Sequence, residues 1–204
     1  MYAHITQRPA SISLKLMGNI NYSITFFLFL ILTVTNQIYS QKKSHLKKME
    51  IKLTSSAFKE GETIPSKYTC EGANLSPQLH WNDTIPDVKS FAIILEDPDA
   101  PGGDFIHWVI YNIPGNIREL HEDITPSRNI SDKILLGTNS FGRIGYGGPC
   151  PPPGKPHRYF FKIYALNTVL HHIGSGATKD QLLKDMEGHI LGEGHLMGKY
   201  KRAK

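Results

Sequence analysis

Short apolar runs broken by proline, glycine and asparagine are the sequence feature that most limits how this chain can fold. No long helical pattern occurs before residue 178, and no repeat recurs at a fixed period. Runs of this kind are typical of antiparallel β-sandwiches. We therefore expect a mainly β fold, a β-sandwich of two antiparallel sheets, with one or two short helices near the C-terminus.

Two of the apolar runs are the strongest candidate strands. Residues 90–96 are apolar on both faces, which predicts a central strand. Residues 157–166 are aromatic and β-branched, and alternation along them places His157 and Tyr159 on one face and Arg158 on the other. Further strands are expected at residues 50–54, 106–113 and 133–137.

A helical pattern occurs at residues 178–190. Thr178 and Gln181 form a capping-box pair at its start. Leu182, Leu183, Met186 and Ile190 then recur at helical spacing. We expect Gly192 and Gly194 to break the chain before a last short element at residues 195–200.

Composition and charge exclude several classes of protein. The chain is 40% hydrophobic and 20% charged, which excludes a disordered or coiled-coil protein. Its net charge of +5 falls to +3 without Arg8 and Lys15, the basic residues of the first forty. No clustered basic face is evident, so we expect no nucleic-acid partner. Two cysteines are too few for a thiolate zinc site.

Residues 1–40 read as a signal peptide, with Met17 as an alternative start. Their apolar run at residues 24–34 is too short to cross a hydrocarbon core of about 30 Å, but it suits the central region of a secretory signal. We expect cleavage before Gln41, a basic linker at residues 41–48, and an exported (periplasmic or secreted) domain at residues 49–204. Two alternatives to a cleaved signal remain: residues 24–34 form an uncleaved membrane anchor, or they form a strand or helix of the fold.

An acidic turn directly follows the strand expected at residues 90–96. Its sequence is Asp97-Pro98-Asp99-Ala100-Pro101. Because Pro98 restricts both itself and Asp97, the two carboxylates are held on a rigid turn where they can bind a cation or orient a histidine. The alternative is a solvated turn in which the aspartates cap local amides.

A loop rich in glycine and proline spans residues 138–156. Gly147 and Gly148 can turn backbone N–H groups toward an anion. The next strand opens with His157 and Tyr159, a polar pair at the start of an apolar face, as at the mouth of a pocket. The alternative is that His157 only completes a local hydrogen bond. His107 opens its own strand, and alternation predicts that it shares a face with Val109 and Tyr111.

Several separated motifs follow one another in order along the chain. They are Tyr68–Gly72, Asn74–Pro77, Asp97–Pro101, His107, Gly147-Gly148-Pro149 and His157-Arg158-Tyr159. Together they resemble the phosphatidylethanolamine-binding protein family, and in particular its bacterial and archaeal branch of Raf kinase inhibitor-like proteins. The resemblance covers about residues 49–202.

The resemblance implies a β-sandwich with a small anion pocket at one end and no cofactor. The pocket would hold a phosphate-like group or phosphorylethanolamine. The glycine amides, the Tyr159 hydroxyl and a protonated His157 or His107 would contact the phosphate, and an aspartate would orient a histidine. Position by position, the ligand-binding residues would be Asp97, Asp99, Pro101, His107, Gly147, Gly148, Pro149, His157 and Tyr159.

Other properties follow from the same resemblance. Family members inhibit kinases and serine proteases, so a protein partner is expected, and the edge strands of a sandwich permit a homodimer. Phe105-Ile106 stands before His107 where eukaryotic members carry an aromatic residue and a second histidine. Because residues 199–204 are short and polar, we expect no counterpart of the C-terminal helix of those members and therefore a more open pocket.

Cys70 and Cys150 both lie in motif-bearing segments. An exported protein would allow a disulfide between them, and two separate buried thiols are the alternative.

Three functions are compatible with these residues. The leading hypothesis is a non-catalytic, Raf kinase inhibitor-like binding protein for a small anion. A metal-dependent hydrolase would instead use Asp97, Asp99, His107 and His157 as ligands, although no Gly-x-Ser-x-Gly or His-Glu-x-x-His motif is present. A structural secreted domain without a physiological ligand is the third.

Overall fold

The computed structural model describes residues 27, 29–33, 49–82, 84–125, 127 and 131–203. The chain divides into two units, residues 1–47 and 48–204. In the first unit, Phe27 and residues 29–33 are helical with exposed side chains. The rest of the expected signal peptide and the basic linker lie outside the described residues. No helix within the described ranges is long and apolar enough to span a membrane.

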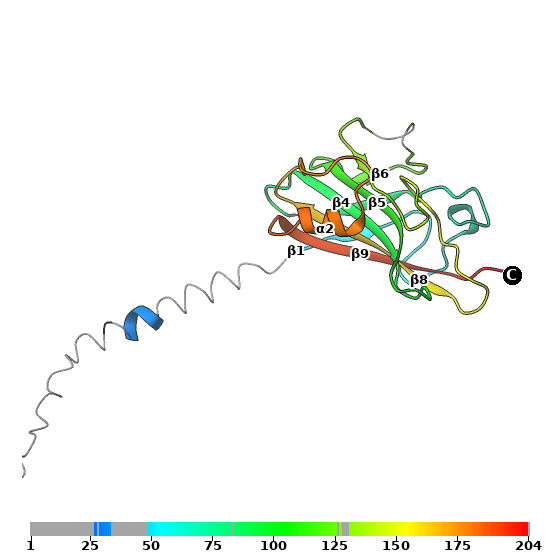
Figure 1. The fold of residues 1–204 in the computed structure, drawn as a ribbon, viewed down its shortest axis with the longest axis horizontal. Helices are drawn as coiled ribbons and strands as arrows, with labels where there is room; N and C mark the ends of the chain where they lie inside the picture. Colours follow the sequence, from blue (N-terminus) through cyan, green and yellow to red (C-terminus); the bar gives the residue numbers. More distant parts are fainter. Residues whose placement is uncertain are drawn as a thin grey trace, which may run out of the picture. The chain divides into compact units, whose positions relative to one another are not determined.

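The second unit contains two β-sheets (Figure 1). In chain order the strands are β1 (Met49–Glu50), β2 (Lys52–Thr54), β3 (Leu79–Asn82), β4 (Ser90–Asp97), β5 (Phe105–Pro114), β6 (Glu119–Leu120), β7 (Leu135–Leu136), β8 (His157–Leu166) and β9 (Ile190–Tyr200). The larger sheet has the order β1-β9-β8-β4-β5-β7, and the smaller one β2-β3-β6. This confirms the mainly β, two-sheet fold, except that β1 and β9 pair in parallel.

The six-stranded sheet separates two layers of apolar side chains. Successive residues of β4 enter different layers, because side chains alternate across a strand. Phe91, Ile93 and Leu95 face the layer shared with the three-stranded sheet. Ala92 and Ile94 face the layer shared with α2 (Lys179–Asp185), which lies over the other face of the large sheet. A short 3-10 helix, η1, covers Ser66–Tyr68.

The helix α2 begins as expected but ends earlier. Thr178 and Gln181 form the predicted capping box. The helix was expected to continue to residue 190, but it stops at Asp185, and Gly188 then adopts a φ of 78° in the turn that follows. Ile190, expected on the last helical turn, is the first residue of β9.

The strand β9 passes straight through the two glycines that were expected to break it. A Cβ on Gly194 would lie 1.8 Å from the carbonyl oxygen of Ile51, and one on Gly192 would lie 2.6 Å from that of Met49. The glycines therefore let the N-terminal strand approach β9 closely, as glycines inside strands often do. Ile51 N–H donates to Glu193 O across this contact, at 2.9 Å.

The antiparallel pairing of β4 with β5 and β8 brings three strand ends together. Asp97 at the end of β4 lies opposite Phe105 at the start of β5. Glu96 lies opposite Phe160, near the start of β8. The acidic turn and the start of the His157 strand therefore meet at one end of the large sheet.

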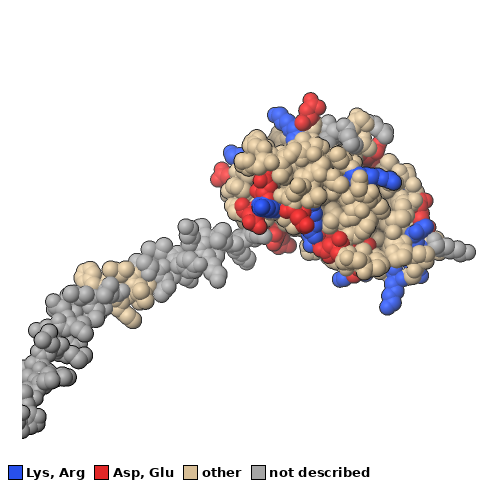
Figure 2. Space-filling model, viewed as in Figure 1, with Lys and Arg blue, Asp and Glu red and all other residues tan. Residues whose placement is uncertain are grey.

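Charged side chains are mixed by sign on the visible surface. On the face drawn in Figure 2, Lys and Arg side chains are interspersed with Asp and Glu side chains. That no nucleic acid is bound stays a prediction.

Candidate functional site

Asp97 and His157 form a nearly buried pair. His157 Nδ1 lies 2.8 Å from Asp97 Oδ2, and the two side chains are only 11% and 4% exposed. Asp97 Oδ1 accepts the N–H of Asp99 at 2.9 Å. The carboxylate therefore fixes the orientation of the imidazole. Within the described part of the chain, nothing bonds His157 Nε2, which remains available to a ligand.

Asp99 is bound to Arg158 rather than to a histidine. Arg158 donates through Nε at 2.9 Å and Nη2 at 2.7 Å, and its backbone N–H donates to the same carboxylate at 2.9 Å. These side-chain hydrogen bonds are the main reason that the pKa of Asp99 is lowered to about 2. Asp99 thus anchors the acidic turn to β8 and leaves Asp97 to orient His157.

A β-bulge changes the face of the sheet toward which the His107 side chain points. The pairing of β5 with β4 shifts register at this residue, and such a bulge places an extra residue on one strand. The His107 ring consequently packs edge-on against Tyr159, with ring centroids 5.3 Å apart. The expectation that His107 shares a face with Val109 and Tyr111 is therefore wrong, because those two residues belong to the layer beneath α2.

The hydrogen bonds of His107 define its protonation. Its Nδ1 lies 2.7 Å from Gly147 O and 3.1 Å from Gly148 O, both acceptors, so Nδ1 carries the proton. Burial of the ring lowers its pKa. In the neutral ring Nε2 is then the remaining acceptor, so these contacts favour His107 as an acceptor and give no support to a protonated His107 that holds an anion.

The Gly147-Gly148 amides do not form the expected anion nest. Gly147 N–H donates to His107 O at 2.8 Å, and Gly148 N–H donates to Asn74 Oδ1 at 2.7 Å. A Cβ on Gly148 would lie 2.3 Å from Tyr68 O. The glycines serve close packing between two loops, and their donors are already used.

Tyr159 carries the unusual feature of the site. Its side chain is fully buried. Its hydroxyl has no well-formed hydrogen bond among the described residues, and the Asp97 carboxylate is a weak, poorly aligned acceptor nearby. Burial, and secondarily the nearby negative charge of Asp97, raises the pKa of Tyr159 well above its ordinary value. Buried hydroxyls almost always have partners, so this donor is the clearest indication that a further molecule belongs here.

An aromatic cluster that the sequence did not reveal borders His107. Phe141 packs edge-on against Phe105, with centroids 4.8 Å apart, and against His107 at 5.5 Å. Asn139 fixes this loop, because its Oδ1 accepts the N–H groups of Phe141 and Arg143 at 3.0 and 3.2 Å. The glycine and proline content marked the loop, but no sequence pattern distinguished Phe141.

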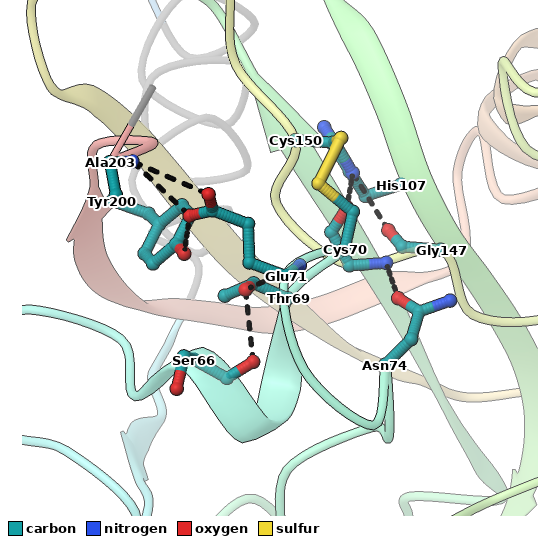
Figure 3. The surroundings of a disulfide bond; sticks show 11 residues. Ser66, Thr69, Cys70, Glu71, Asn74, His107, Gly147, Cys150, Tyr200 and Ala203 are labelled. Atoms are coloured by element: carbon teal, nitrogen blue, oxygen red, sulfur yellow. Dashed lines mark hydrogen bonds between the residues drawn. A yellow bond between two sulfur atoms is a disulfide. The ribbon is translucent and has the colours of Figure 1, made fainter. Parts of the chain in front are cut away.

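Cys70 and Cys150 form a disulfide, one of the two arrangements that the sequence allowed. Cys70 N–H also donates to Pro149 O at 3.1 Å. The bond therefore ties the loop after η1 to the segment whose glycine carbonyls hold His107, and Figure 3 shows the disulfide beside that ring.

The expected site residues do not all converge. Contacts connect Asp97 to His157, and His107 to Gly147, Gly148 and Tyr159. Pro149 is buried beside the disulfide, whereas Pro101 is exposed in the acidic turn and outside these contacts.

The four residues considered as metal ligands do not form such a set. No group of three or more His, Cys, Asp or Glu residues within the described ranges is placed to hold a metal ion. Asp99 is occupied by Arg158, and His107 Nδ1 faces two carbonyls. The geometry gives the metal-dependent hydrolase no support.

Comparison with known proteins identifies the family. The sequence-family model described as phosphatidylethanolamine-binding protein matches residues 54–201. The chain belongs to the phosphatidylethanolamine-binding protein family. The resemblance inferred from the motifs is thereby confirmed, and the chain is of the UPF0098 type among members of this family.

Relatives and solved structures of family members agree. A UPF0098 protein of Aquifex aeolicus is 48% identical, with 72% of this chain and 86% of the relative covered. One from Methanothermobacter thermautotrophicus is 47% identical, with 74% and 98% covered. The crystal structure of the phosphatidylethanolamine-binding protein homologue CT736 of Chlamydia trachomatis is similar with a TM-score of 0.68 and 41% identity, covering 75% of this chain and 98% of that one. The E. coli family member YbcL gives a TM-score of 0.71 and 32% identity, with 76% and 99% covered.

Proposed function

We propose that this member of the phosphatidylethanolamine-binding protein family is a non-catalytic binding protein for a small anion of the phosphate or phosphorylethanolamine type. The ligand would lie where Asp97, His157 and Tyr159 meet. The observation that supports the proposal is the buried hydroxyl of Tyr159, which has no well-formed hydrogen bond within the part of the chain that the structure describes. Leaving a buried donor unsatisfied costs about 1–3 kcal/mol, and a ligand oxygen would remove that cost.

The histidines would supply complementary groups to the same ligand. His157 donates Nδ1–H to Asp97. When its ring carries a second proton, Nε2–H is a charge-assisted donor for an anionic oxygen. Neutral His107 has Nε2 as an acceptor. The pair therefore favours an anion that still carries one proton, such as a hydrogen phosphate or a singly protonated phosphate monoester.

We also propose that the domain is exported. The apolar run at residues 24–34 suits a secretory signal, and a structural disulfide is typical of proteins outside the cytosol. Inhibition of a partner protein and formation of a homodimer stay predictions of the family resemblance.

Isothermal titration calorimetry with inorganic phosphate and with phosphorylethanolamine tests the binding proposal. The wild type should bind at least one of them, and His157→Ala should weaken that affinity by tenfold or more. His121→Ala is the matched control, because that histidine side chain is 77% exposed. Absence of binding to the wild type, or equal binding by His157→Ala, would overturn the proposal.

A further inference from the structure

A cavity lies at the opposite end of the large sheet from Asp97. It has a volume of about 550 Å³. Lys89, Pro114 and the segment after β8 border it, and they cluster where Ser90 opens β4 opposite Pro114 and Leu166. At about 3.3 Å per residue along β4, the two ends are separated by on the order of 20 Å. This cavity is therefore independent of the proposed anion site.

The wall of the cavity is fixed by side chains of the sheet. Asn112 pairs with the backbone of Leu170 on both sides, donating to its carbonyl and accepting its N–H, each at 2.9 Å. Ser90 Oγ donates to Thr168 O at 2.6 Å, and the Tyr111 hydroxyl donates to Gly174 O. Because these bonds anchor the loop after β8 at three points, the cavity is formed before any ligand arrives, which lowers the cost of binding.

The cavity combines an apolar floor with basic side chains. Its apolar lining comes from Pro114, Leu135, Val169, Leu170 and Ile173. Val169 remains 38% exposed, which leaves an aliphatic surface open to a ligand.

Lys89, Lys133 and His171 come from three separate segments and line the same cavity, with no Asp or Glu among the lining residues. Neither lysine forms an ion pair with another residue that the structure describes. Two ammonium groups beside an aliphatic floor are complementary to a molecule that is apolar at one end and anionic at the other.

We propose that this cavity binds an amphiphilic anion with a single alkyl chain, an alkyl carboxylate or an alkyl phosphate. The chain would lie against Leu135, Val169 and Ile173, and the head group would pair with Lys89 and Lys133. Carboxylate and phosphate head groups can both pair with lysine, so one probe of each kind is needed to tell an alkyl carboxylate from an alkyl phosphate.

The probes are decanoate, decyl phosphate and the cation decyltrimethylammonium, titrated below their micellar concentrations and followed by calorimetry. At least one anionic probe should bind with a dissociation constant below about 1 mM, corresponding to more than about 4 kcal/mol, and the cation should not bind. Lys89→Gln/Lys133→Gln should weaken binding tenfold or more, and Val169→Asp should abolish it. Lys155→Gln, at an exposed lysine outside the cavity, is the control.

His157→Ala separates this proposal from the proposed function. It should leave unchanged the binding of decanoate, and that part of decyl phosphate binding which Lys89→Gln/Lys133→Gln removes, even where it abolishes binding of phosphate. The proposal is overturned if neither anionic probe binds or if the cation binds equally well. It is also overturned if the lysine variant binds both anionic probes like the wild type, or if His157→Ala removes binding of decanoate.

Discussion

His157 Nδ1 and Asp97 Oδ2 lie 2.8 Å apart although sixty residues separate them in sequence. The antiparallel pairing of β4 with β8 produces this contact, because it places the end of one strand beside the start of the other. The carboxylate can then hold the imidazole in one orientation and leave Nε2 free to face a ligand.

Asp97→Asn should weaken the binding of phosphate by about tenfold or more, because hydrogen bonds to charged groups contribute about 1.5–3 kcal/mol. The amide has nearly the same shape but no charge to support an imidazolium. Calorimetric titration with phosphate measures the change, and Asp132→Asn, at an exposed position, is the control. Unchanged affinity in Asp97→Asn would show that the carboxylate does not support the ligand-binding histidine.

Gly148→Ala should lower the free energy of unfolding by about 1–3 kcal/mol, since a methyl group here overpacks a contact between two loops. The added carbon would lie 2.3 Å from Tyr68 O, a backbone atom that cannot move away freely. Gly102→Ala is the control, because nothing lies within 4 Å of its Cβ position. Urea unfolding measures the free energy of unfolding of both variants. Equal values for Gly148→Ala and Gly102→Ala would contradict the packing role assigned to Gly148.

Reduction of the Cys70–Cys150 disulfide should destabilise the domain substantially. The bond closes a loop with a sequence separation of 80, for which the chain-entropy model gives roughly 4 kcal/mol. Thermal unfolding with and without a reductant measures the loss, and Cys70→Ala/Cys150→Ala supplies the control, since the reductant should not affect it. A melting temperature of the wild type that is insensitive to complete reduction would refute this prediction.

Asp99 should contribute to acid unfolding. Its pKa is about 2 in the folded protein against 3.8 ordinarily, chiefly because Arg158 binds its carboxylate. The unfolded chain therefore takes up the proton first, so the stabilisation is complete above about pH 5 and is lost progressively as the pH falls toward about 2. Asp99→Asn should be less stable at pH 5 but lose less stability between pH 5 and 2.5 in urea unfolding. If the wild type and Asp99→Asn lose the same free energy of unfolding between pH 5 and 2.5, Asp99 does not contribute to acid unfolding.

Much of the fold was predictable because its signals are local. The strand at residues 157–166 was predicted with the bounds that it has, and the capping box of Thr178 and Gln181 marked the start of α2 correctly. The passage of β9 through Gly192 and Gly194 was not predictable. Those glycines normally break a strand, and here they are required by the backbone of Met49 and Ile51, which no local pattern reveals.

The site residues were predicted better than their roles. Their positions followed from family motifs, but the chemistry depended on hydrogen bonds that only the folded chain fixes. The register shift that turns His107 toward Tyr159 depends on pairing with another strand. Likewise, the amides of Gly147 and Gly148 are occupied by groups on distant segments, so a glycine pair that suggested an anion nest instead permits close packing.

The central claim is that the Tyr159 hydroxyl donates to a bound anion. Calorimetry and thermal unfolding of Tyr159→Phe, with and without phosphate, test it most directly. The substitution removes one buried oxygen that has no well-formed hydrogen bond among the described residues, and it leaves the ring in place. In the absence of ligand the variant should unfold at the same temperature as the wild type or higher, because the cost of an unsatisfied hydroxyl disappears. Its affinity for phosphate should fall by tenfold or more. Phosphate that binds and stabilises both proteins equally would contradict the assignment of Tyr159 as a ligand donor, and with it the proposed site.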